Sequence, residues 1–131
     1  MNQAQKDVIA VAGNVLRDGC HNASLTSGWW NDLHTGEELI HRPHIVGEKL
    51  MLIVSEVAEA MEGHRKGLQD SHLIDRPMVE VELADAVIRI MDLAGAMGLD
   101  IGGAIADKMD YNAHREDHKL EHRQAEGGKK Y

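Results

Sequence analysis

Apolar and polar residues follow one another along this chain at the three- to four-residue spacing of helices, and no stretch shows the strict alternation of a strand. The first helix is predicted over residues 3–18, and Gly19 is expected to end it. Its apolar positions are Val8, Ile9, Ala12, Val15 and Leu16. Residues 20–43 are rich in polar and turn-forming side chains, so we predict a long loop there.

Three further helices are predicted after this loop. The second covers residues 44–66 and is followed by glycine, which commonly ends helices. The third covers residues 77–97, and its Pro77 suits a first helical turn. The fourth runs from residue 101 to about residue 123, with Asp100 as its N-cap. Four main helices without a strand predict an all-α fold.

The second and third helices are apolar on almost every side, which is typical of helices buried all round. A chain of 131 residues buries a smaller share of its surface than a large one and often oligomerises. We therefore expect a single all-α domain over residues 1–125 and a flexible tail over residues 126–131. We also expect a second copy to complete the helical bundle, as a homodimer or homotetramer.

Two pairs of carboxylates lie inside these apolar helices. Glu56 and Glu59 form the first pair, Glu82 and Asp85 form the second, and the spacing places each pair on one helical face. A single such pair would more often be a solvated surface feature, but two pairs in apolar helices carry negative charge toward an interior, where it is costly. Hard cations such as Mg²⁺ relieve that cost through oxygen ligands. We therefore predict a site for two or three metal ions that holds a polyphosphate and activates water.

The fourth helix offers an opposing set of side chains. Lys108, Asn112 and Arg115 are spaced to share one face, and Lys and Arg bind phosphate oxygens. An ordinary solvated face is the alternative interpretation of this set. On the third helix, Arg89 follows Asp85 by one turn, and we expect it to form a structural salt bridge rather than to contact substrate.

The predicted loop contains two tryptophans, Trp29 and Trp30, followed by Asn31. Aromatic side chains can stack on nucleobases, so Trp30 and Asn31 are candidate substrate-binding residues. The alternative is that a tryptophan in a loop covers the hydrophobic core, which is the more common role of such a residue.

Net charge, cysteine content and the length of apolar runs limit the possible binding partners and cellular location of the chain. The net charge of −8 argues against nucleic acid, which is bound through many Lys and Arg side chains, whereas a small anionic substrate is compatible when metal ions carry positive charge. The single Cys20 forms no internal disulfide, which fits a cytoplasmic location. The longest apolar runs, Val8–Ala12 and Leu50–Val54, are too short for a membrane span or a signal peptide.

Taken together, the two acidic pairs resemble the Glu-x-x-Glu and Glu-x-x-Asp signature of the MazG-like all-α nucleoside triphosphate pyrophosphohydrolases. The Lys108, Asn112 and Arg115 spacing is similar to the phosphate-contacting helix of that family, so the match covers about residues 28–115. The layout with Gly28-Trp29-Trp30 ahead of the signature resembles phage members, and among them the MazZ subgroup, which acts on dGTP and GTP.

This resemblance implies that a ribo- or deoxyribonucleoside triphosphate and water give the monophosphate and diphosphate. It implies that the four carboxylates hold Mg²⁺ or Mn²⁺, that Glu59 orients or deprotonates the attacking water, and that Lys108 and Arg115 contact phosphates. It also implies dimers or dimers of dimers, in the host cytoplasm if a phage encodes the chain. Other substrates within the family are dUTP, dCTP and phosphoribosyl-ATP, and a non-catalytic helical module that dimerises or binds a partner is the alternative from another class.

Overall fold

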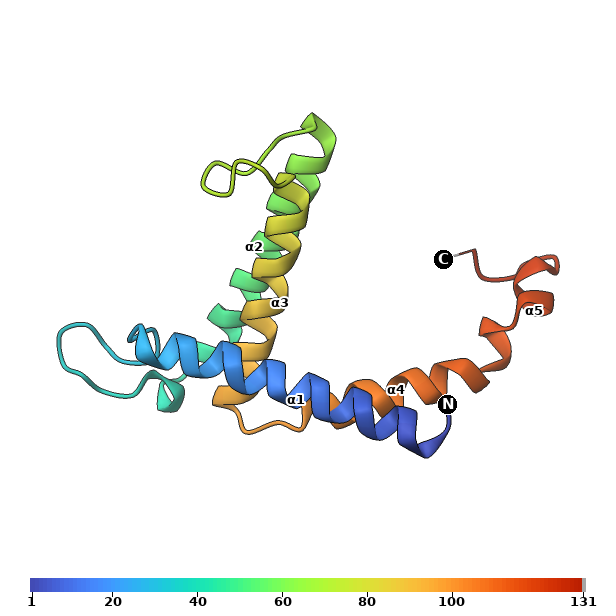
Figure 1. The fold of residues 1–131 in the computed structure, drawn as a ribbon, viewed down its shortest axis with the longest axis horizontal. Helices are drawn as coiled ribbons and strands as arrows, with labels where there is room; N and C mark the ends of the chain where they lie inside the picture. Colours follow the sequence, from blue (N-terminus) through green and yellow to red (C-terminus); the bar gives the residue numbers. More distant parts are fainter. Residues whose placement is uncertain (131) are drawn as a thin grey trace. The chain divides into compact units, whose positions relative to one another are not determined.

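The computed structural model describes residues 1–130, and these form helices and no strand, which confirms the all-α prediction (Figure 1). The elements in chain order are α1 (Gln3–Thr26), η1 (Leu39–His41), α2 (Ile45–Lys66), α3 (Met78–Ala96), α4 (Ile101–His114), η2 (Glu116–His118) and α5 (Leu120–Gln124). Within this described part of the chain, no helix combines the length and the apolar character that a membrane crossing requires.

The chain divides into two compact units. Unit 1 contains residues 1–15 together with the segment that begins at Asp100, and unit 2 contains Leu16–Leu99. Helix α1 therefore contributes residues to both units. The single domain over residues 1–125 stays a prediction, and Tyr131, the last residue of the predicted tail, lies outside the described residues.

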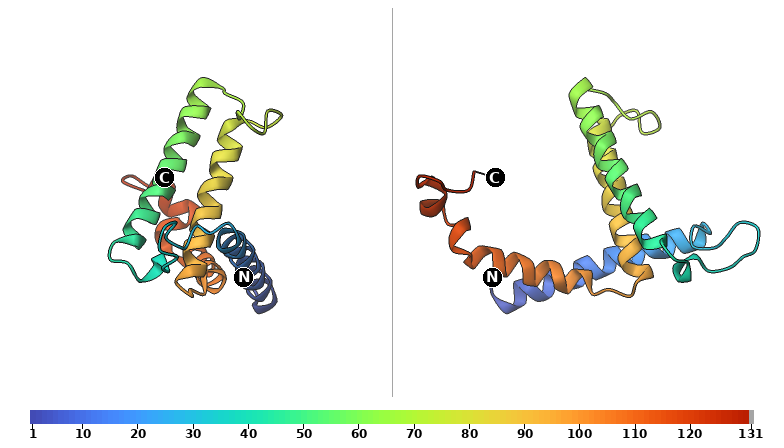
Figure 2. Two further views of the ribbon diagram at one scale, coloured as in Figure 1. Left: turned by 90° about the vertical axis from the view of Figure 1, so that its left-hand side faces the viewer. Right: turned by 180° about the vertical axis from the view of Figure 1, so that it is seen from behind.

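Unit 2 is built on the α2–α3 hairpin, whose two helices run side by side in the views of Figures 1 and 2. Gly67 ends α2 with a φ of 61°, a left-handed conformation that glycine adopts without strain. Close to that end, Gly63 is buried against Met78 at the start of α3, and a Cβ on Gly63 would lie 2.8 Å from the Met78 Cγ. Small residues therefore allow the two helices to approach closely, and the predicted helices at residues 44–66 and 77–97 are confirmed within one residue at each end.

The first helix is longer than predicted. Gly19 does not end it, and α1 continues to Thr26. A glycine inside a helix costs only about 1 kcal/mol relative to alanine, so contacts further along can outweigh it. His21 and Ser24 supply such contacts, because their side chains bond the carboxylate of Asp92 on α3 at 2.8 Å each.

The remaining part of the predicted loop is ordered by one aspartate. The Oδ1 atom of Asp32 accepts hydrogen bonds from the backbone N–H groups of His34 and Thr35, and its Oδ2 accepts one from Arg42 at 2.8 Å. These bonds hold the pKa of Asp32 well below its usual range. The loop thereby leads into α2 and places Trp30 in a buried cluster with Ile45 and Leu93.

The fourth helix is shorter than predicted. Helix α4 ends at His114, and Arg115 is extended, with φ −70° and ψ 130°. The guanidinium of Arg115 donates two hydrogen bonds to the carboxylate of Asp117, at 2.9 and 2.6 Å, and this local bidentate pair fits the turn into η2. The prediction of one continuous helix to about residue 123 is therefore wrong.

In unit 1, α1 and α4 touch through glycines. A Cβ on Gly13 would lie 2.7 Å from the Gly102 Cα, and a Cβ on Gly102 would overlap the carbonyl oxygen of Ala10. The Gly102 N–H donates to the Asn14 side chain at 3.0 Å. This close approach requires the absence of a side chain at both glycines.

We expect Gly102→Ala to lower the free energy of unfolding by about 2 kcal/mol, because the overlap with α1 exceeds the gain in helix propensity. Gly19→Ala is the matched control: no atom lies within 4 Å of a Cβ there, so alanine should stabilise by about 0.5–1 kcal/mol. Urea denaturation of the two variants at one protein concentration measures both changes. Equal effects of the two substitutions would contradict the packing described for unit 1.

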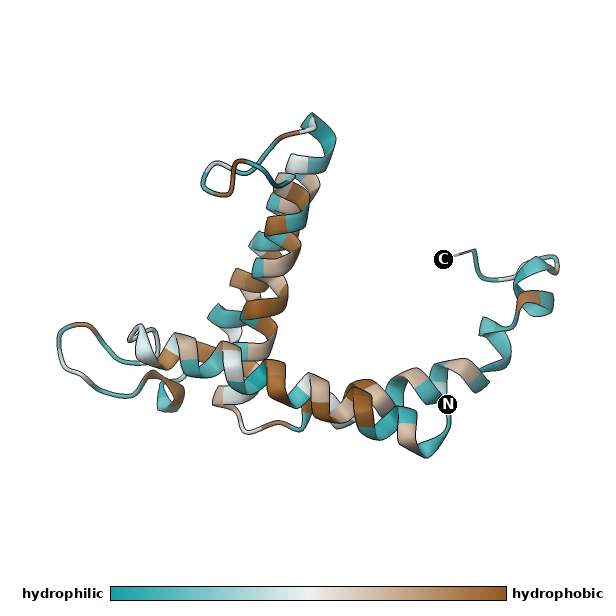
Figure 3. Cartoon of the chain, in the orientation of Figure 1, coloured by the Kyte–Doolittle hydropathy of each residue, from teal (hydrophilic) through white to brown (hydrophobic). Residues whose placement is uncertain are grey.

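Hydrophobic residues recur along both helices of the hairpin (Figure 3), and many of them are exposed. On α2 and α3, large apolar residues between 39% and 64% exposed are Leu50, Met51, Leu52, Val54, Val57, Met61, Leu83, Val87, Ile88 and Ile90. Large apolar residues exposed in this number on two neighbouring helices favour an interaction surface on the hairpin.

Candidate metal centre

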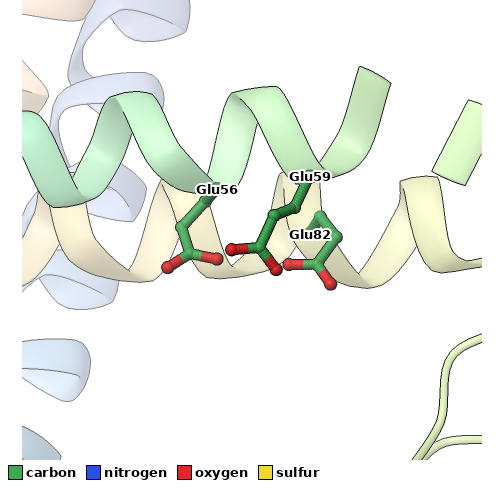
Figure 4. Close-up of side chains that lie close together, drawn as sticks. All are labelled: Glu56, Glu59 and Glu82. Atoms are coloured by element: carbon green, nitrogen blue, oxygen red, sulfur yellow. The ribbon is translucent and has the colours of Figure 1, made fainter. Parts of the chain in front are cut away.

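Three carboxylates meet between the two helices of the hairpin. Each of Glu56, Glu59 and Glu82 offers an oxygen, and these oxygens all lie within 4.8 Å of one another (Figure 4). Helix α2 supplies the first two from successive turns, and α3 supplies the third. The predicted first acidic pair and the first acid of the second pair are thus brought together.

Burial makes this cluster electrostatically expensive. Glu56 is only 7% exposed and Glu82 only 8%, whereas Glu59 is exposed. Burial, a hydrogen bond shared with Glu56, and the charges of the neighbouring acids raise the pKa of Glu82 above its ordinary value of 4.5. The Nε of Arg89 donates to the Glu56 Oε1 at 2.7 Å, so the salt bridge predicted for Arg89 is present, with Glu56 as its partner.

The donor set fits a hard divalent cation. Mg²⁺ and Mn²⁺ prefer carboxylate oxygens, and oxygens around one octahedral ion at about 2.1 Å lie about 3–4 Å apart. The oxygens of Glu56, Glu59 and Glu82 all lie within 4.8 Å of one another, so one cation could be shared by the three carboxylates. Glu59, the exposed member, leaves one side open for water or substrate.

Asp85, the fourth predicted ligand, lies one turn after Glu82 on α3 but is not among these three. It lines a cavity of about 500 Å³ beside the cluster, together with Arg89 and Asp92. The cavity also takes in Lys49 and the exposed Trp29. It therefore combines acids, cations and an accessible aromatic ring in a volume within the usual size of ligand sites.

The two tryptophans have different environments. Trp30, the predicted base-binding residue, is 4% exposed and its Nε1 donates to Asp92 at 2.7 Å, so it is part of the core. Trp29 is 68% exposed and faces the cavity instead. Asn31 donates from its amide to the carbonyl of Gly36 at 3.1 Å and lines a smaller cavity of about 210 Å³. Trp29 is thus the tryptophan with a ring available for stacking.

Two further residues belong to this region, and sequence reasoning missed the first of them, Lys49. Lys49 lies with its Nζ 4.4 Å from the centre of the Trp30 ring and lines the large cavity. Asp92 accepts bonds from three side chains and forms part of the cavity wall, and the signal for it was a charged residue in the apolar run of α3.

The predicted phosphate-binding residues belong to unit 1, whereas the acidic cluster belongs to unit 2. Lys108 has its Nζ 4.8 Å from the Tyr111 ring centre, and Arg115, beyond the end of α4, is bonded to Asp117. Asn112 has a buried Oδ1 without a hydrogen-bond partner among the described residues. Their role in binding phosphate stays a prediction.

Comparison of the chain with known proteins found no similar sequence or structure. No family model matches the chain, and no match is found among curated proteins or among solved structures. The functional argument therefore depends on the residues of the site themselves.

Divalent metal is expected to stabilise this chain in a pH-dependent way. Folding raises the pKa of Glu82, so the protonated form of this carboxyl stabilises the folded state. This stabilisation is fully present below pH 4.5 and is lost as the pH rises through the pKa of the folded state. A cation has the opposite preference, since it binds the deprotonated carboxylate. We expect Mn²⁺ to raise the melting temperature by about 5 °C near neutral pH and by little below pH 4.5.

Thermal melts with Mn²⁺ and with EDTA, across a pH series, measure this difference. Glu82→Gln serves as the control, because the variant cannot titrate at this position and loses an anionic ligand. A metal-induced gain that stays constant over the pH series would contradict binding at Glu82.

Proposed function

We propose that the chain is a metal-dependent nucleoside triphosphate pyrophosphohydrolase, which converts a ribo- or deoxyribonucleoside triphosphate and water to the monophosphate and diphosphate. The observation that carries the proposal is the convergence of Glu56, Glu59 and Glu82, two of them buried, beside a cavity of nucleotide size. Buried acids without a matching number of basic partners favour a site for cations.

We assign the roles of the acidic residues from their positions. Glu56 and Glu82, held on facing helices, would hold Mg²⁺ or Mn²⁺, two or three ions per site, and Asp85 would extend this set toward the cavity. When bound, such ions lower the pKa of water and stabilise charge on phosphate oxygens. Glu59, the exposed acid, would take a proton from the attacking water as general base.

The proposal includes a second copy of the chain. The exposed apolar surface of α2 and α3 supports this, because burying it against the same surface of another copy would complete a four-helix bundle. A homodimer, or a homotetramer built from two of them, is the assembly that we propose.

Guanine nucleotides are the proposed substrates, on the resemblance to the MazZ subgroup. Support from the site is limited to its chemistry: Trp29 offers a ring for any base, and Lys49 and Arg89 give the cavity positive charge for an anionic ligand. The related substrates dUTP, dCTP and phosphoribosyl-ATP would use the same acidic cluster. A non-catalytic helical module is the alternative from another class.

The deciding experiment incubates the chain with the common ribo- and deoxyribonucleoside triphosphates and with phosphoribosyl-ATP in Mg²⁺, and separates diphosphate from orthophosphate. Release of nucleoside monophosphate and inorganic diphosphate supports the proposal. The substrate that is hydrolysed fastest identifies the preferred base. Release of nucleoside diphosphate and orthophosphate would contradict the proposed cleavage between the α and β phosphates. No hydrolysis of any substrate, together with no stabilisation by metal, favours the non-catalytic module.

A further inference from the structure

Among the described residues 1–130, Arg89 is the cationic side chain that forms a bond with the acidic cluster. Its Nε donates to the Glu56 Oε1 at 2.7 Å, and its side chain is 42% exposed whereas that of Glu56 is 9% exposed. Arg89 also lines the 500 Å³ cavity, together with Asp85 one turn before it on α3. This single side chain therefore connects the cluster with the cavity.

A cation and Arg89 make competing demands on Glu56. A cation shared by Glu56, Glu59 and Glu82 needs an oxygen of the same Glu56 carboxylate to which the guanidinium is bonded. Two positive groups on one carboxylate repel each other, and burial of the carboxylate weakens the screening by solvent. Arginine cannot lose its proton to relieve this repulsion, but a long and partly exposed side chain can turn away.

We infer that Arg89 opposes metal binding through its bond to Glu56, and that it turns to the phosphate chain of the nucleotide when cation and nucleotide are both bound. This inference rests on the proposed function, because it takes both ligands from it. The position of Arg89 in the cavity wall gives the guanidinium access to phosphate oxygens, which arginine binds with paired hydrogen bonds.

One consequence is that the nucleotide and the cation strengthen each other's binding. The phosphate chain draws the guanidinium away from Glu56 and so removes the competitor of the cation. By linkage, the cation must raise the affinity for the nucleotide by the same factor. Phosphate oxygens that ligate the cation also couple the two ligands, so Arg89 accounts only for the part of the coupling that is lost when it is replaced.

The experiment titrates Mn²⁺ into wild type and Arg89→Gln, with free Mn²⁺ followed by electron paramagnetic resonance. Each titration is run alone and with the α,β-imido analogue of dGTP, which resists cleavage between these phosphates. Without nucleotide, the variant should bind Mn²⁺ about ten-fold more tightly than wild type. The analogue should increase the affinity of wild type for Mn²⁺, and the factor of this increase should be about ten-fold smaller in the variant.

Lys49→Gln is the matched control, because it removes one positive charge from the same cavity without touching the cluster. Its affinity for Mn²⁺ alone should stay within about two-fold of wild type. Circular dichroism establishes that both variants are folded.

Three results would overturn the inference. Mn²⁺ binding by Arg89→Gln that is equal to or weaker than wild type would leave Arg89 as a structural partner of Glu56. Equal tightening in Lys49→Gln would assign the effect to net charge. No Mn²⁺ binding by wild type would instead overturn the proposed function, and the inference with it, so the two failures are distinguishable.

Discussion

Glu59→Gln is expected to release diphosphate from its best substrate at least about 100-fold more slowly than wild type. The substitution keeps the size of the side chain but removes the basic oxygen, and a positioned general base commonly contributes 10²–10⁴-fold. Glu59 is the exposed acid of the cluster, so it is the member that water can reach. Its loss as a metal ligand would add to the effect.

Glu62→Gln on the same helix is the matched control. Glu62 lies one turn further along α2, is paired with Arg65 and Lys66, and is not part of the cluster. Its substitution should leave the rate within about two-fold of wild type, since exposed pairs contribute little. Both variants should keep the oligomeric state and the helical content of wild type. Full activity of Glu59→Gln in such a folded sample would remove Glu59 from the mechanism.

Much of the site could be predicted because its geometry is local. Two acids three residues apart on a helix must share a face, and this places Glu56 beside Glu59 whatever surrounds them. The apolar setting of the two pairs also predicted that carboxylates would be buried, and Glu56 and Glu82 are. The departure of Asp85 from the three-acid cluster could not be foreseen, because it depends on how α2 and α3 are rotated against each other.

The differences from the predicted helix ends have two physical origins, one in contacts between residues distant in sequence and one in a local contact. Gly19 is a sound local signal for a helix end, but bonds from His21 to α3 carry the helix past it. For Trp30 the sequence left base contact and a core role open; the bond to a carboxylate 62 positions away and the packing with Ile45 and Leu93 make it part of the core. At Arg115 the error was local, because a bidentate pair with Asp117 competes with helix continuation.

The second large effect is expected at Asp92, which joins three segments of unit 2. Its carboxylate accepts hydrogen bonds from Trp30 Nε1 at 2.7 Å, from Ser24 Oγ at 2.8 Å and from His21 Nδ1 at 2.8 Å. At 8% exposure, few water molecules could replace it. Asp92→Ala leaves buried donors without an acceptor, at about 1–3 kcal/mol for each group.

We therefore expect Asp92→Ala to lower the free energy of unfolding by about 3 kcal/mol and the melting temperature by about 10 °C. Asp75→Ala, at an exposed position in the loop between α2 and α3, should change the free energy by less than about 0.5 kcal/mol. Urea denaturation and thermal melts at one protein concentration measure both variants, because oligomerisation would make stability depend on concentration.

The same variant separates the core of unit 2 from its acidic cluster. Asp92 bonds none of Glu56, Glu59 and Glu82, so Asp92→Ala should still bind Mn²⁺ well below its melting temperature. Its Trp30 ring, released from the carboxylate, should show a changed fluorescence spectrum. A variant as stable as wild type would mean that the three donors find other partners, and Asp92 would then not be the residue that fixes α1 and the loop to α3.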